Sequence, residues 1–246
     1  MYQVPSKNEV TQFINDYHKI YSDKFKVFAY SRIVQLTALN QLIQSHKLIN
    51  QKHIGVISGA ISEPELALFR SEKITNCAYE EDKIYDLDNS WLEWPSKNFS
   101  LTICNHTFEH IFNPFVAVKN IIHHTAIGGY IFLSMPVVDC VHGEPHFYYS
   151  GFHPRFLERL AKENNLEILS LGAWGNHKVM VNSLHGAWLT EQDCRRGLGL
   201  FDLANPKAMY RKLIQNFRQI PFIFEDGQIN SHKYMTNTWA LLRKSS

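Results

Sequence analysis

The strongest constraint on the fold is an alternation of short apolar runs with helical segments between residues 53 and 176. The apolar runs have the length of buried strands and cover residues 53–58, 73–79, 101–105, 130–136 and 166–171. Residues 114–125 and 154–164 carry apolar side chains at helical spacing, and the pair Gly128-Gly129 is expected to stop the first of these helices. Strands that alternate with helices predict a doubly wound, mainly parallel α/β sheet. Ligands of such sheets bind beyond the carboxyl ends of the strands.

A third helix is predicted directly after the first strand. Pro64 suits a first helical turn, and Ser62 and Glu65 have the spacing of a capping box. The small residues Ser58, Gly59 and Ala60 lie between that strand and helix, where a ligand could approach the backbone and an anionic group could meet a helix N-terminus. An ordinary turn explains these small residues equally well.

The segments outside the alternating region divide the chain further. Residues 1–50 contain two amphipathic patterns, at residues 10–17 and 33–43, and are interpreted as an N-terminal helical cap. Residues 51–176 form the predicted Rossmann-like core, and residues 177–228 read as a helical insertion that could cover an acceptor. Residues 229–246 return to strand character and are expected to close the sheet.

Composition excludes several classes of protein. With 25 basic and 23 acidic residues the formal net charge is +2, which argues against a dedicated nucleic-acid binder. The four cysteines form no CxxC pair, so neither a disulfide framework nor a zinc knuckle is indicated. The polar N-terminus and the lack of any run of 18 apolar residues predict a cytoplasmic protein without a membrane span.

Histidine is the unusual component, because nine of the 13 histidines lie between His106 and His185. Three readings compete for His142, Glu144 and His146, which follow the strand at 130–136: a general base with orienting groups, polar packing of the loop, or a metal site built on HxExH. The first is preferred, and no metal is predicted. The pair Glu109-His110 is expected to cap a helix and anchor a loop.

Residues 98–136 carry the most specific pattern. A strand runs into Glu109-His110, then a helix that follows Asn113-Pro114, then Gly128-Gly129 and a strand that ends at Pro136. In this order of parts the chain resembles the class I S-adenosylmethionine-dependent methyltransferases. The following stretch, residues 142–176, is similar to that of methyltransferases associated with glycan and surface-polysaccharide biosynthesis.

The resemblance implies a Rossmann-like fold that binds S-adenosyl-L-methionine. It places the methionine end of the cofactor near Ser58, Gly59 and Ala60, the ribose near Glu80, and the adenine near Asp86 and Leu87. Asn105 and His106 would line the sulfonium region. The carboxylate of Glu80, about 20 residues after the first loop, is also well placed to accept hydrogen bonds from ribose hydroxyls. A solvent-exposed acidic turn explains Glu80 equally well.

The function expected from these features is transfer of a methyl group to oxygen of a small or carbohydrate-linked acceptor, with His142 or His146 as the base. Nitrogen is the less favoured acceptor atom, and a homo-oligomer is compatible with the sequence. The first loop of the family usually holds an acidic residue and paired glycines. In residues 53–63 the glycines are not paired, and no acidic residue precedes Glu63 at the end of the stretch. A non-catalytic binding or scaffold protein with the same fold is therefore the alternative.

Overall fold

The computed structural model describes residues 4–20, 30–59, 63–77, 98–139, 142, 145–175, 180 and 235–245. The helical elements are α1 (Lys7–Ile20), α2 (Tyr30–Ser45), the 3-10 helices η2 (Pro64–Leu68) and η3 (Phe108–His110), α3 (Pro114–His124) and α4 (Pro154–Glu163). The strands are β1 (Asn50–Ile57), β2 (Arg70–Cys77), β3 (Phe99–Asn105), β4 (Thr125–Pro136), β5 (Leu166–Trp174) and β6 (Asn237–Lys244).

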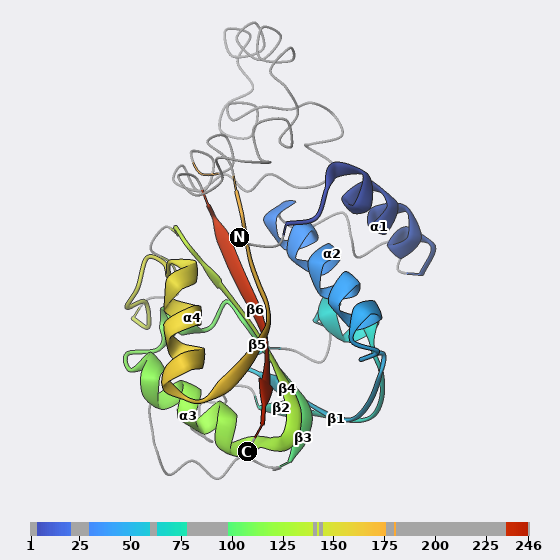
Figure 1. Cartoon of the computed structure of the whole chain (residues 1–246). Helices are drawn as coiled ribbons and strands as arrows, with labels where there is room; N and C mark the ends of the chain where they lie inside the picture. The colour runs from blue at the N-terminus through green and yellow to red at the C-terminus, as the bar shows by residue number, and fades with distance from the viewer. Residues whose placement is uncertain are drawn as a thin grey trace, which may run out of the picture.

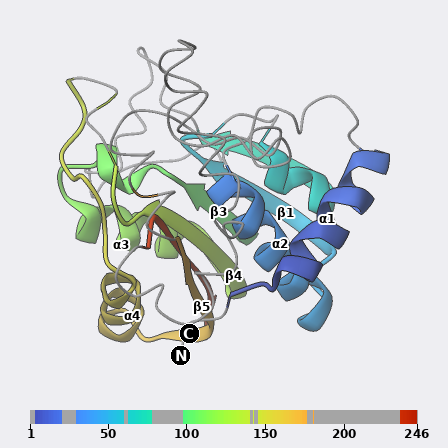
Figure 2. The same ribbon diagram turned by 90° about the horizontal axis from the view of Figure 1, so that it is seen from above.

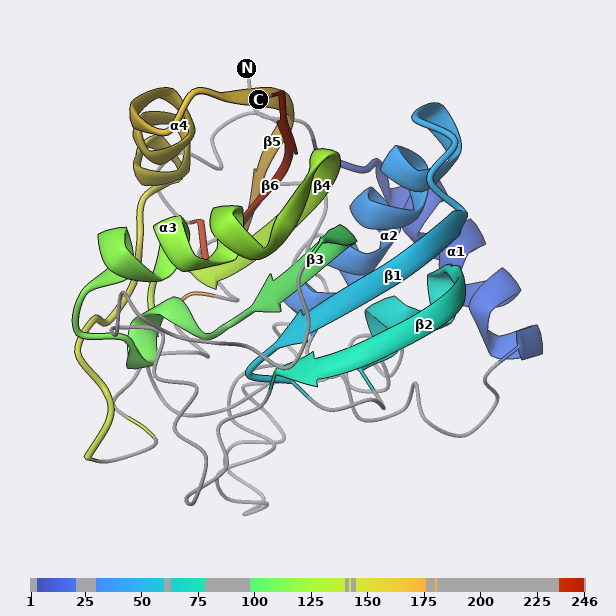
Figure 3. The same cartoon turned by 90° about the horizontal axis from the view of Figure 1, so that it is seen from below.

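These six strands form one sheet in the order β2-β1-β3-β4-β6-β5. Strands β2, β1, β3 and β4 pair in parallel, and β6 runs antiparallel between β4 and β5. Figure 3 shows the parallel strands side by side and twisted relative to one another, as expected of such a sheet. The predicted doubly wound, mainly parallel α/β fold is confirmed.

Helices cover both faces of the sheet (Figures 1 and 2). On one face, apolar residues of α1 and α2 such as Phe13 and Leu39 join β-strand residues such as Ile54 and Phe132 in a single buried cluster. On the other face, α3 and α4 bury Ile121 and Leu157 among the remaining strand side chains. The two N-terminal helices are therefore one of the layers of the fold.

The helix predicted after the first strand is only a five-residue 3-10 helix, η2. Its N-cap residue is Glu63, which makes no side-chain capping bond, and the Glu65 side chain is bound to Arg32 of α2. The next strand begins at Arg70, whose backbone N–H already donates to Ile49 O at 2.7 Å. This short connection leaves no length for a longer helix.

One further expectation needs correction. Helix α3 ends at His124, where Thr125 adopts an extended conformation, and Gly128 and Gly129 lie inside β4 instead of stopping the helix. A Cβ on Gly129 would stand 2.9 Å from Phe99 O, so a close approach of β3 and β4 explains this glycine. The expected final strand is present as β6, which lies between β4 and β5 and joins β5 to the sheet.

The predicted insertion, residues 177–228, lies outside the described residues apart from residue 180, so the proposed division into domains stays a prediction. In the part of the chain that is described, no helix has the length and apolar character needed to cross a membrane.

Candidate functional site

The candidate site lies where the chain changes direction across the sheet. From β1 the chain passes to β2 on one side, and it then enters β3 on the other side. In open α/β sheets the ligand lies beyond the carboxyl ends of the strands at this switch point. Ser58 and Gly59 follow β1, and Asn105 and His106 stand at the end of β3, so the structure places these four predicted residues at the switch point.

The loop after β1 is tightly built. Ser58 has a positive φ of 52°, and its backbone N–H donates to Cys77 O at 3.2 Å, which holds the loop to the end of β2. A Cβ on Gly59 would stand 2.8 Å from Val56 Cγ1 and 3.0 Å from Glu63 Cγ. A side chain here would collide first with Val56 and then with Glu63, which favours glycine.

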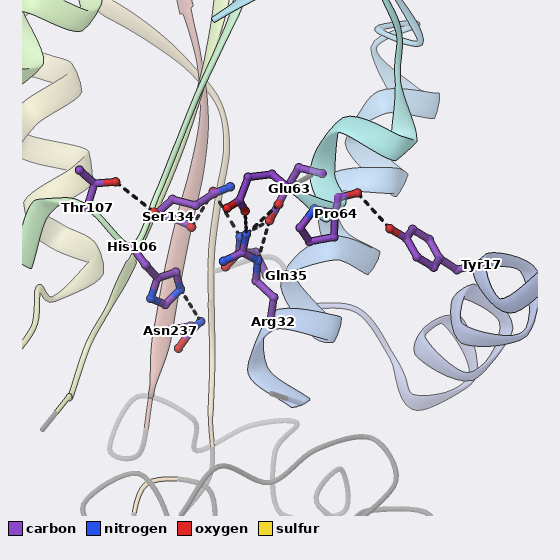
Figure 4. Close-up of polar contacts among 11 residues, drawn as sticks. Tyr17, Arg32, Gln35, Glu63, Pro64, His106, Thr107, Ser134 and Asn237 are labelled. Carbon is purple, nitrogen blue, oxygen red and sulfur yellow. Dashed lines mark hydrogen bonds and ion pairs between the residues drawn. The ribbon is translucent and has the colours of Figure 1, made fainter. Parts of the chain in front are cut away.

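Behind this loop lies a network of ion pairs (Figure 4). The guanidinium of Arg32, on α2, contacts Glu65 through Nε at 2.7 Å and a terminal nitrogen at 2.8 Å, and Glu63 at 2.6 Å. Burial lowers the pKa of Arg32, but the carboxylates of Glu65 and Glu63 outweigh it and the pKa is raised. Arg32 is therefore a permanent cation compensated by its two carboxylate neighbours.

Gln35 connects this network to the end of β3. Its amide nitrogen donates to Glu65 Oε1 at 3.3 Å and to Asn105 Oδ1 at 3.4 Å. The Asn105 oxygen also accepts a hydrogen bond from Ser134 Oγ at 2.8 Å, which fixes the side chain against β4. Asn105 Nδ2 is buried without a partner among the described residues.

His106 is the residue after β3 and has the left-handed φ of 46°. Its backbone N–H donates to Ser134 O at 2.9 Å, and its Nε2 lies 3.1 Å from the amide nitrogen of Asn237 on β6. Because an amide nitrogen only donates, Nε2 accepts and the ring proton is on Nδ1. Burial, together with Arg32, His142 and His110, lowers the pKa of His106 to about 3. The imidazole is therefore neutral at physiological pH.

Glu109, in η3, is a buried carboxyl group without a close cation. Its side chain is 1% exposed, its Oε1 lies 3.8 Å from His106 Nδ1, and its Oε2 has no hydrogen-bond partner among the described residues. Burial, with a smaller contribution from Asp139, raises the pKa of Glu109 to about 8 although its own backbone N–H opposes the shift. The Glu109 carbonyl accepts hydrogen bonds from the backbone N–H groups of Tyr148 and Tyr149.

The loop after β4 folds back over η3 through these bonds and through histidine side chains. His110 Nδ1 donates to His146 O at 2.6 Å, and the ring centroid of His110 lies 4.8 Å from that of His142. Phe147 packs against both rings, at 5.8 and 4.9 Å. The expected anchoring of this loop by Glu109 and His110 is thus confirmed, although no side chain caps η3.

Of the predicted site residues, six lie within the described part of the chain. Ser58, Gly59, Asn105 and His106 meet at the switch point, whereas His142 and His146 stand over η3. The other five lie outside the described residues: Ala60, Glu144, Glu80, Asp86 and Leu87. The roles assigned to these residues stay predictions.

Three residues of the site escaped sequence reasoning. Arg32 and Gln35 lie in α2, a helix that is buried on nearly all sides and far from any motif, and Asn237 is 131 positions from its partner His106. For Arg32 and Gln35, the only signal in the sequence was that polar residues stand within an otherwise apolar stretch of a predicted helix. Nothing in the local sequence singles out Asn237.

Comparison with known proteins gives structural but not sequence relatives. The scan against protein-family models finds no match, and the search of curated proteins also finds none. Among solved structures, a proposed sarcosine dimethylglycine methyltransferase from Galdieria sulphuraria is similar with a TM-score of 0.51 and 11% identity, over 97% of this chain and 99% of the other. This likeness shows that the chain has the fold of the class I methyltransferases.

Two further structures are less similar. Phosphoethanolamine N-methyltransferase 2 of Haemonchus contortus, in complex with S-adenosyl-L-methionine, has a TM-score of 0.48 at 11% identity. The match covers 86% of this chain, which spans about half (52%) of that enzyme. Coclaurine N-methyltransferase, bound to N-methylheliamine and S-adenosylhomocysteine, has a TM-score of 0.45 at 11% identity, over 98% of this chain and 88% of the other.

Proposed function

We propose that the protein is an S-adenosyl-L-methionine-dependent methyltransferase. The observation that carries this proposal is the set of polar residues at the switch point of a methyltransferase-like sheet: Ser58 and Gly59 after β1, and Asn105 and His106 after β3. Ligands of this fold class bind at that place. The sequence resemblance, found independently in residues 98–136, points to the same cofactor.

The charges at the switch point suit a sulfonium ion. His106 is neutral because of its lowered pKa, and the cationic Arg32 is compensated by Glu63 and Glu65. A second cation next to the sulfonium would be repelled in a site of low dielectric constant. In this proposal Asn105 and His106 line the sulfonium region, and residues 58–60 hold the methionine end.

The proposed reaction is O-methylation of a small or carbohydrate-linked acceptor. The cofactor supplies an electrophilic methyl group, and the protein aligns the acceptor oxygen with it. With the cofactor bound, the methyl–sulfur bond would break as the oxygen–methyl bond forms, which leaves S-adenosylhomocysteine. The acceptor proton would pass to an imidazole of the loop after β4, either His142 or His146, with Glu144 nearby in sequence. Asp139 Oδ2 lies 3.9 Å from His142 Nδ1 and would stabilise the imidazolium that results.

Calorimetry tests this proposal directly. The full chain is titrated with S-adenosylhomocysteine and S-adenosyl-L-methionine, and binding of both is expected. Asn105→Ala should weaken binding by about tenfold, or ~1.4 kcal/mol. Asn164→Ala is the matched control, because Asn164 binds only the end of α4 at Leu160 O. Absence of binding at millimolar ligand would contradict the proposal.

One observation favours the non-catalytic alternative. Glu63 Cγ lies 3.0 Å from the position of a Cβ on Gly59, and the Glu63 carboxylate is bound to Arg32, so there is little space beside Gly59. If the space beside Gly59 is too small for a cofactor, the wild type should fail to bind S-adenosylhomocysteine and Glu63→Ala should gain binding. Tight binding by the wild type rejects this alternative.

A further inference from the structure

We propose that Glu109, His110 and His142 form a binding site for a divalent transition-metal ion. One ligand atom from each of the three side chains lies within 4.8 Å of the others. The residues come from η3 and from the loop after β4, which the fold brings together at the carboxyl edge of the sheet. They are not the HxExH set of His142, Glu144 and His146 that the sequence suggests.

The buried carboxylate is the first independent argument for a ligand. Glu109 is 1% exposed, and its Oε2 has no hydrogen-bond partner in the described part of the chain. A buried carboxylate oxygen without a partner is costly, and buried charges are normally paired or bound to a metal. A cation bound at Oε2 would satisfy this oxygen.

The orientation of His110 is the second argument. Its Nδ1 donates to the backbone carbonyl of His146 at 2.6 Å, which fixes the ring and leaves Nε2 as the atom that can ligate. Histidine ligands of metals usually donate their other ring N–H to a carbonyl or carboxylate in this way. The ring of His142 lies beside that of His110, with ring centroids 4.8 Å apart, so both rings can reach one ion.

The third ligand is adjustable. His142 has a side chain 42% exposed, and its Nδ1 lies 3.9 Å from Asp139 Oδ2. Metal–ligand distances of about 2.0–2.2 Å require ligand atoms roughly 3.5 Å apart in a tetrahedral site. A rotation of the exposed His142 ring would bring its ligating nitrogen closer to the ligand atoms of Glu109 and His110. Asp139 would then accept a hydrogen bond from the other ring nitrogen of His142.

The donor set selects the kind of metal. Two imidazoles and one carboxylate suit Zn²⁺ and neighbouring transition metals, whereas Mg²⁺ prefers a set made of oxygen atoms. Three protein ligands leave at least one open position, as in zinc sites that bind a substrate or water. The metal site does not depend on the proposed methyl transfer; if both exist, His142 is a ligand and His146 is the remaining candidate for the base.

Metal binding by the full chain tests this inference without any activity assay. Protein treated with a chelator is titrated with Zn²⁺ in competition with a chromophoric chelator, and with Co²⁺ while its visible absorption is recorded. About one equivalent should bind, and His142→Ala, His110→Ala and Glu109→Gln should each weaken Zn²⁺ binding at least tenfold. Co²⁺ should give the intense absorption bands typical of a site with four or five ligands.

Two controls make the result specific. His123→Ala removes an exposed histidine of α3, and His146→Ala keeps the carbonyl that orients His110; both should retain the wild-type affinity. Absence of Zn²⁺ binding by the wild type, or binding that survives His142→Ala, would overturn the proposal. A loss in His146→Ala as large as that in His142→Ala would overturn this ligand set in favour of HxExH.

Because His142 is exposed, its variant answers the question even if Glu109→Gln does not fold. Binding of S-adenosylhomocysteine, measured separately, distinguishes failure of the metal site from failure of the proposed function.

Discussion

The loops after β1 and β3 each bring a buried glutamate to the same edge of the sheet, but they treat its charge in opposite ways. Glu65, behind the first loop, is bound by Arg32 through two nitrogens and is also contacted by Gln35. Glu109, after β3, lies 3.8 Å from the Nδ1 of a neutral His106, and one of its oxygens has no hydrogen-bond partner among the described residues.

This difference separates a structural network from a candidate reactive one. The Arg32 network joins α2 to η2 and so fixes the helical layer against the loop after β1. The Glu109 carboxyl group forms no ion pair with an arginine or lysine among the described residues. Buried groups with shifted pKa values cluster at functional sites, so Glu109 is the candidate for a functional role. The two regions should therefore respond differently when a partner is removed.

Loss of Arg32 should have the largest effect. Arg32→Met leaves Glu65 buried without its cation, and removal of one partner from a buried ion pair costs about 3–5 kcal/mol. The free energy of unfolding, measured with guanidinium chloride, should fall by this amount. Arg32→Met combined with Glu65→Leu removes both charges and should recover most of the loss. A decrease below about 1 kcal/mol in the single variant would mean that the ion pairs do not hold the helical layer.

Glu109 should instead produce a dependence of stability on pH. Its pKa is raised from 4.5 to about 8, so between these values the folded protein keeps a proton that the unfolded chain has lost. The stability that this group contributes is fully present below pH 4.5 and is lost as the pH rises through 8. In metal-free protein this loss should reach about 1–3 kcal/mol, the cost of an unsatisfied buried group.

The variant Glu109→Gln isolates this effect. Asp139, His106, His110 and His142 surround Glu109 in both proteins, so the difference between the two stability curves reports on Glu109. The wild type should lose stability relative to the variant between pH 4.5 and 8. Parallel curves over this range would show that Glu109 is ionised in the folded protein and would remove the contrast with Glu65.

Gln35 joins the two regions and should have a smaller effect than Arg32. Its bonds to Glu65 and Asn105 are long, at 3.3 and 3.4 Å, and its Oε1 has no partner in the described structure. Gln35→Met keeps the volume and should cost about 0.5–1.5 kcal/mol in chemical unfolding. Together with Ser134→Ala it forms a double-mutant cycle around Asn105, and a coupling energy near zero would show that Asn105 does not connect the two networks.

Most of the fold followed from local sequence patterns, because strand and helix periods are local properties. The first loop shows where this reasoning stops. Ser62 and Glu65 fit a capping box by spacing, but Glu65 binds Arg32, which lies 33 positions earlier. A long-range ion pair outweighs a weak capping preference, and no pattern within a few residues reveals it.

The site was harder to predict than the fold for the same reason. The order of elements along the chain puts Asn105 and His106 at the end of a central strand. Because the neighbouring strands run parallel to it, their carboxyl ends lie at the same edge of the sheet. The neutral state of His106 depends on burial and on Asn237, and the cluster with Glu109 depends on how the loop after β4 folds back. These are tertiary contacts, which sequence spacing does not contain.

Thiol reactivity should give the smallest effect and compares the two regions without mutation. Cys77 ends β2 beside the first loop, and Cys104 lies in β3 next to the Glu109 region. Burial raises the pKa of each to about 12, and for Cys104 the charge of Glu109 adds to the shift while a hydrogen bond with Thr107 opposes it. Native protein at pH 8 should leave both thiols unlabelled by iodoacetamide, because the thiolate is the reactive form. Mass spectrometry of tryptic peptides identifies the labelled positions. Labelling of Cys104 alone would show that the β3 region opens locally, whereas equal labelling of both, at the rate of global unfolding, would show that the two regions open only together.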